Sequence, residues 1–128
     1  MSLPLLQRVK TFLDEQSLHT GYGAEWFTWN DSRLAGAGGF ICYQMAGSAG
    51  LRDEIVQRPD VRLIVVGAPT KTVEVDAKAK EIYDAFAGLE TTTGVIKFEP
   101  IGVVGGAYIL DNKRWAFEII VRCFVEDY

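Results

Sequence analysis

The chain closes with VVGGAYIL (residues 103–110), DNK (111–113) and RWAFEIIVRCFVEDY (114–128), which together predict a long β-hairpin. Successive side chains of a strand point to opposite faces. One face of the last strand would therefore be apolar throughout: Trp115, Phe117, Ile119, Val121, Cys123 and Val125. The other would mix apolar with charged side chains: Glu118, Ile120, Arg122, Phe124 and Glu126. A mixed face of this kind is typical of a surface that is half wet or covered by a neighbouring subunit.

The predicted hairpin contains residues that are typical of a tight turn and of a strand irregularity. Asp111 and Asn112 tolerate the left-handed conformations of tight turns. Gly105 and Gly106 interrupt an otherwise good strand, which indicates either a β-bulge or a place where another chain approaches the backbone closely.

Upstream of the hairpin, the sequence predicts two helices and four further strands. Apolar residues recur at helical spacing from Leu5 to Leu13, with Ser2 as cap and an end near Gln16, and again over residues 73–87, where Gly88 is the stop. Short runs typical of strands occupy residues 25–30, 40–45, 61–66 and part of 95–99. We therefore expect a single α+β domain over residues 1–128, in the order αβββαβββ, with two helices packed on one face of a mostly antiparallel or mixed sheet.

The pattern also predicts assembly. The strands VRLIVV (61–66) and FICYQM (40–45) are apolar on both faces, so a partner subunit is the economical cover for the second face. The long segment Ala46–Asp60 contains both charges and apolar anchors, and we interpret it as a loop that docks on a partner. The candidate oligomer-interface residues are Arg52, Asp53, Glu54, Ile55, Val56, Arg58, Ile120, Arg122 and Phe124.

Composition excludes several classes of function. The chain has 128 residues, 48% of them hydrophobic and 23% charged, which is typical of one packed domain. The net charge is −4 and no Lys/Arg run is present, which disfavours tight nucleic-acid binding. Residues 1–12 lack the apolar stretch of a signal peptide, and no apolar run approaches the ~20 residues of a membrane helix, so we expect a cytoplasmic protein without a membrane partner.

No pattern of catalytic residues emerges. His19 is the only histidine, and we interpret it as polar surface. Cys42 and Cys123 lie in apolar strand patterns and read as core residues. The glycines at positions 36, 38 and 39 lack a phosphate-binding spacing and read as a flexible tip. We expect no catalytic residue, no metal and no cofactor.

The order of these elements resembles the tail terminator or tail completion (minor tail) proteins of long-tailed phages and prophages. The resemblance lies in the helix LLQRVKTFL (5–13), in Arg58-Pro59-Asp60 leading into VRLIVVGAP (61–69), in VEVDAKAKEIYDAFAGL (73–89), and in the closing pair over residues 101–125. It implies a structural protein of the virion that assembles in the host cytoplasm as a ring of six. Such a ring caps the tail tube, ends its polymerisation and meets the head-completion or connector protein. DNA only passes through its lumen.

Two alternatives stay open. One is another neck or head-tail completion component of the same particle. The other is a small dimeric α+β enzyme or ligand-binding module, whose pocket would be lined by Trp26, Trp29, Tyr43 and Trp115.

Overall fold

The computed structural model describes residues 4–27, 38–48, 57–68, 72–109 and 114–126. Within them the chain forms two helices and six strands, in the predicted order αβββαβββ. The elements are α1 (Leu5–Glu15), β1 (Tyr22–Trp26), β2 (Gly39–Ser48), β3 (Pro59–Val66), α3 (Thr72–Ala87), β4 (Lys97–Pro100), β5 (Gly105–Ile109) and β6 (Trp115–Phe124). The predicted α+β class is confirmed.

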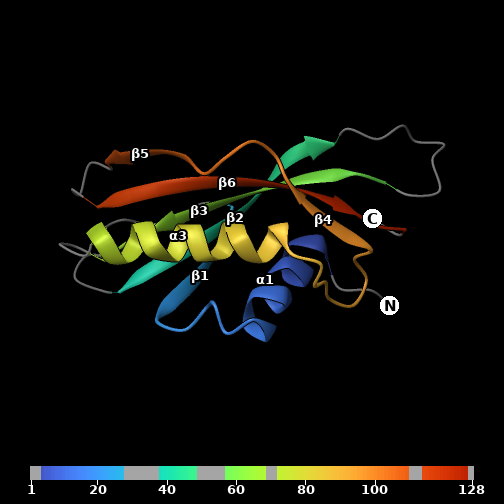
Figure 1. The fold of residues 1–128 in the computed structure, drawn as a ribbon, viewed down its shortest axis with the longest axis horizontal. Helices are drawn as coiled ribbons and strands as arrows, with labels where there is room; N and C mark the ends of the chain where they lie inside the picture. Colours follow the sequence, from blue (N-terminus) through green and yellow to red (C-terminus); the bar gives the residue numbers. More distant parts are fainter. Residues whose placement is uncertain (1–3, 28–37, 49–56, 69–71, 110–113, 127–128) are drawn as a thin grey trace.

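The strands form one open mixed sheet in the order β1-β2-β3-β6-β4, and β5 pairs with β6 beside β4. Only the β1–β2 pair is parallel, and β5 and β6 form the predicted C-terminal hairpin. Both helices pack on the same face of the sheet (Figure 1). The strands β3 and β6 lie in the interior of the sheet, which explains why their helix-side residues are all apolar.

The first helix begins and ends through backbone geometry. Its predicted cap, Ser2, lies outside the described residues, and the carbonyl oxygen of Pro4 accepts hydrogen bonds from the amides of Gln7 and Arg8 at 3.0 and 3.1 Å. After Glu15 the chain reverses at Ser17, whose φ of +58° is left-handed. The amide of Leu18 then donates to the carbonyl of Leu13, which caps the helix end.

The core lies between the helices and the sheet. Its centre is three aromatic rings, one each from α1, α3 and β4. The Phe12 ring lies 5.1 Å from that of Phe86 and 4.7 Å from that of Phe98, and the Phe86 and Phe98 rings are 5.0 Å apart. Because these three elements are far apart in the sequence, this contact fixes both helices on the sheet.

The opposite face of the sheet is divided into two parts. At one end Phe40, Cys42, Ile64, Val66 and Ala116 form a second cluster, each with at most 6% of its surface exposed. The expectation that a partner subunit covers this face is therefore wrong for that end, since the chain buries it by itself. The other end is half-exposed and is described below.

Of the two glycine predictions, the flexible tip is wrong at Gly39 and the β-bulge at Gly105 is confirmed. Gly39 is the first residue of β2. A Cβ atom at this position would lie 2.6 Å from the Tyr22 ring and 2.7 Å from the Val66 carbonyl oxygen. The bulge is confirmed by a register shift between Gly105 and Tyr108. A Cβ at Gly105 would lie 3.1 Å from Glu118, so the close approach there involves the same chain.

Some element bounds also differ from the prediction. The first strand is Tyr22–Trp26 instead of residues 25–30. The predicted loop Ala46–Asp60 is shorter than expected, since β2 continues to Ser48 and β3 begins at Pro59.

Candidate functional site

The candidate site is the half-exposed end of the sheet face on which neither described helix packs, and we call this end the helix-free face. Cross-strand register places its side chains together, because residues directly opposite each other on neighbouring strands share a face. It comprises alternate residues of β3, β6 and β4: Asp60, Arg62, Lys97, Glu99, Glu118, Ile120, Arg122 and Phe124. Three of the predicted interface residues, Ile120, Arg122 and Phe124, therefore lie on one surface.

Asp60 and Arg122 form the best-aligned ion pair of this face. They are directly opposite each other on β3 and β6. The Arg122 guanidinium donates from Nε to Asp60 Oδ1 at 3.0 Å and from a terminal nitrogen to Oδ2 at 3.4 Å. This two-pronged bond raises the pKa of Arg122 above its ordinary value, mainly through the hydrogen bond itself. The hydrogen bonds thereby hold the guanidinium across the strands against Asp60 of β3.

Two looser contacts flank that pair. Arg62 Nε lies 3.4 Å from Glu118 Oε2, in a geometry that makes an ion pair but no hydrogen bond. On the outer strand, Lys97 Nζ lies 3.6 Å from Glu99 Oε2 and 5.5 Å from the centre of the Phe124 ring. Both contacts are substantially exposed, so they contribute little to the stability of the isolated domain.

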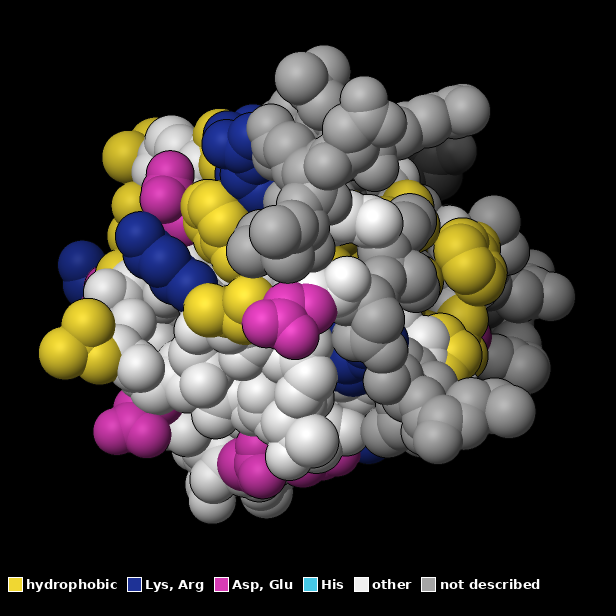
Figure 2. Space-filling model, turned by 90° about the vertical axis from the view of Figure 1, so that its right-hand side faces the viewer, with side chains coloured by type: hydrophobic (Ala, Val, Ile, Leu, Met, Phe, Trp, Pro, Cys, Tyr) yellow, Lys and Arg dark blue, Asp and Glu magenta, His cyan; other side chains and the backbone are white. Residues whose placement is uncertain are grey.

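The charges of the helix-free face cancel. Asp60, Glu99 and Glu118 balance Arg62, Lys97 and Arg122, one to one. The same mixing appears at the end of the molecule shown in Figure 2, where acidic, basic and hydrophobic side chains alternate among the coloured residues. A balanced surface with apolar residues between paired charges is suited to contact with another protein and gives nucleic acid no excess positive charge to bind.

The remaining predicted interface residues are Arg58 and five residues that precede it in the sequence. Arg52, Asp53, Glu54, Ile55 and Val56 lie outside the described residues. Arg58 is described and half-buried, one residue before β3 begins. Its assignment to an interface, like that of Ile120, Arg122 and Phe124, stays a prediction.

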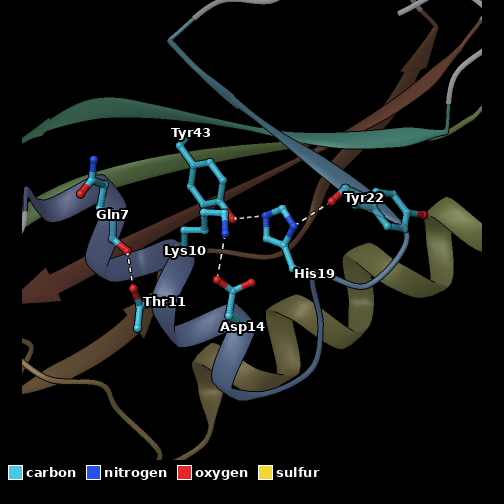
Figure 3. Close-up of polar contacts among 7 residues, drawn as sticks. All are labelled: Gln7, Lys10, Thr11, Asp14, His19, Tyr22 and Tyr43. Atoms are coloured by element: carbon cyan, nitrogen blue, oxygen red, sulfur yellow. Dashed lines mark hydrogen bonds and ion pairs between the residues drawn. The ribbon is translucent and has the colours of Figure 1, made fainter.

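His19 has a structural role that the sequence did not reveal. It is half-buried, where a surface residue was expected. Its Nδ1 lies 2.9 Å from the Tyr22 carbonyl oxygen and its Nε2 lies 2.8 Å from the Tyr43 hydroxyl (Figure 3). Because a carbonyl oxygen can only accept, Nδ1 donates to Tyr22, and in the neutral imidazole Nε2 then accepts from the Tyr43 hydroxyl. Burial, and secondarily the nearby Asp14, raises the pKa of Tyr43 well above its ordinary value and keeps that hydroxyl a donor. His19 thus ties the α1–β1 loop to β2.

The predicted aromatic pocket does not form as expected. Trp26 lines a hollow beside α1, but Tyr43 is fully buried beneath it, with ring centres 5.1 Å apart. Trp115 packs against the helix-side core instead, and Trp29 lies outside the described residues. The residue that sequence reasoning missed is Phe27, which completes the hollow.

The described residues offer no other chemical centre. Cys42 and Cys123 are fully buried, as predicted. Burial raises the pKa of the Cys42 thiol to about 11, with a smaller contribution from Glu25, and that of the Cys123 thiol to about 12, with a smaller contribution from Asp60. No group of three metal-ligating side chains, and no helix long and apolar enough to cross a membrane, occurs in the described parts of the chain.

Comparison with known structures defines the class of domain. A chain of the structure titled "Virion of native gene transfer agent (GTA) particle" has the same fold, with a TM-score of 0.63 and 16% sequence identity over 95% of this chain and 94% of that one. No match was found among curated protein sequences. The model of the family described as "Phage tail termination protein" matches residues 2–127, and the chain therefore belongs to that family. Family membership makes it a structural component of a phage tail, associated with the virion and with other proteins of the particle.

Proposed function

We propose that the chain forms a ring that caps the tail tube, ends its polymerisation and provides the surface to which the head joins. The ring has six copies, as the resemblance implies, and forms in the host cytoplasm. Its partners are the tail tube protein and the head-completion or connector protein. The chain has no enzymatic activity and needs no cofactor.

The observation that carries this proposal is the family match over residues 2–127, nearly the whole chain. Two structural features support it. The helix-free face combines half-exposed apolar side chains with balanced charges, as protein contact surfaces do. The net charge of −4 is compatible with a lumen through which DNA passes without being held.

The test is deletion of the gene from the phage or prophage that encodes it, followed by negative-stain microscopy of the tails. We expect tails much longer than normal and without heads, because nothing stops tube polymerisation. A plasmid copy of the gene should restore both length and head joining. Headless tails of normal length would contradict termination and identify a different neck component.

A further inference from the structure

An apolar hollow of about 500 Å³ lies beside the edge strand β1. It is lined by residues 4–7 at the start of α1 and by Trp26, Phe27 and Met45 from the ends of β1 and β2. None of these side chains is charged. The volume falls in the range of binding pockets and exceeds that of a single aliphatic side chain.

The mouth of this hollow is held in a strained conformation. Phe27 has a φ of +69°, which bulky residues rarely adopt. Its amide donates to the Tyr43 carbonyl at 2.9 Å, and its own carbonyl accepts from Gln44 Nε2 at 2.7 Å. The strand β2 thus fixes the backbone, while 59% of the Phe27 side chain and 38% of Trp26 remain exposed. Strain that the surrounding structure enforces marks a functional position.

A matching apolar knob lies at the other edge of the sheet. Val103, in the turn between β4 and β5, is 79% exposed. Tyr83 of α3 donates its hydroxyl to the Gly102 carbonyl at 2.7 Å, and the Ile101 amide donates to the Ile120 carbonyl at 2.8 Å. The turn, residues 101–104, is uncharged and held on both sides, so it would lose little conformational entropy on binding.

The hollow and the knob stand at opposite edges of one sheet, β1 at the lower and β5 at the upper edge in Figure 1. A closed ring repeats one contact between two different patches of the same chain. The residues that would meet at the centre of the contact are uncharged in both patches, while Asp76, Lys80 and Asp84 of α3 lie beside the Val103 turn and would form a charged rim. We infer that the Val103 turn of one copy inserts into the Phe27 hollow of the next copy in the ring. This inference rests on the proposed function.

Cysteine cross-linking of the full chain tests the contact directly. On mild oxidation, the variant Phe27→Cys/Val103→Cys should form disulfide-linked multimers, seen as a ladder of bands in a denaturing gel. The largest band should contain as many copies as the ring. The matched control is Phe27→Cys/Val73→Cys, because Val73 is 78% exposed on α3, and it should stay monomeric in a denaturing gel. The native thiols are fully buried and do not compete. Rings in the microscope without a ladder, or with an equal ladder in the control, would overturn the inference.

A second pair of variants covers the case in which Phe27→Cys itself disturbs the contact. Val103→Asp should weaken ring association by about tenfold or more, because at least one valine side chain is no longer buried. Val73→Asp should leave it unchanged, and both variants should keep the wild-type melting temperature. Equal association of the two variants in light scattering would contradict the contact. If the wild type forms no ring even with tail tube protein, both the proposed function and this inference fail. If the wild type and Val103→Asp both cap tail tubes normally, the proposed function stands and only the inference fails.

Discussion

Neutralising the Asp60–Arg122 pair should affect assembly far more than folding. In the isolated domain the two side chains are 17% and 30% exposed and their closest atoms are 3.0 Å apart. At that distance two unit charges interact by about 1.4 kcal/mol in a water-like dielectric. The entropy of fixing the arginine reduces this, so we expect a coupling free energy of about 0.5–1 kcal/mol between Asp60→Asn and Arg122→Gln in urea unfolding of the dilute monomer.

If the helix-free face is the predicted oligomer interface, a neighbouring copy covers the same pair in the ring. Removing one partner of a buried pair leaves an uncompensated charge and costs about 3–5 kcal/mol. Each single variant should therefore weaken ring association by roughly a hundredfold or more. The double variant Asp60→Asn/Arg122→Gln should recover part of the loss, since it leaves no unpaired charge.

The assay is a double-mutant cycle measured twice, by urea unfolding of the monomer and by light scattering of the ring. The matched control is the Lys10–Asp14 pair on α1, at 2.9 Å and 33% and 47% exposed, which should couple by only a few tenths of a kcal/mol in unfolding and not at all in association. If the Asp60–Arg122 pair also shows no coupling in association, Arg122 does not lie in an interface and the prediction for the helix-free face is refuted.

Three further predictions concern the fold. Phe12→Ala should lower the free energy of unfolding by about 3–5 kcal/mol and the melting temperature by about 11–18 °C, because its ring is fully buried between two others; a loss below about 1 kcal/mol would contradict this packing. Tyr43→Phe should cost about 1 kcal/mol by removing the hydrogen bond to His19, and an unchanged urea midpoint would exclude that bond. Since burial raises the thiol pKa values to about 11 for Cys42 and about 12 for Cys123, the unfolded state loses these protons first and stability should fall as pH rises above about 9. Replacing both cysteines by alanine should reduce the decline between pH 8 and 10, and an equal decline would show that other groups cause it.

The sequence predicted the faces of the sheet better than its edges. In β6 the alternation of apolar and mixed residues matched the two faces residue by residue, because strand geometry is local and has a strict period of two. The first strand was misplaced, since the aromatic run at residues 25–30 has a stronger strand propensity than the Gly23-Ala24 stretch that actually pairs. Its parallel pairing with β2 is a long-range contact for which no local signal exists.

The same distinction explains what could be predicted of the site. Ile120, Arg122 and Phe124 were recognisable because a mixed face stands out within one strand. Asp60, the partner of Arg122, lies 62 positions away, and only the β3–β6 register brings the two together. Phe27 was missed because an aromatic run predicts extended backbone, whereas two hydrogen bonds from β2 hold this residue at a positive φ.

The association surfaces that we propose for the ring are weak one by one. Here the large apolar core lies between the helices and the sheet, and the surfaces that we assign to assembly lie outside it. On the helix-free face, paired charges separate the apolar side chains. The hollow and the Val103 turn are small and lie at opposite edges of the sheet. In a closed ring each copy makes the hollow–turn contact twice, and the last contact forms within an already joined assembly, where the effective concentration is high. In the proposed ring, closure would therefore turn contacts that are too small for a stable dimer into a stable assembly.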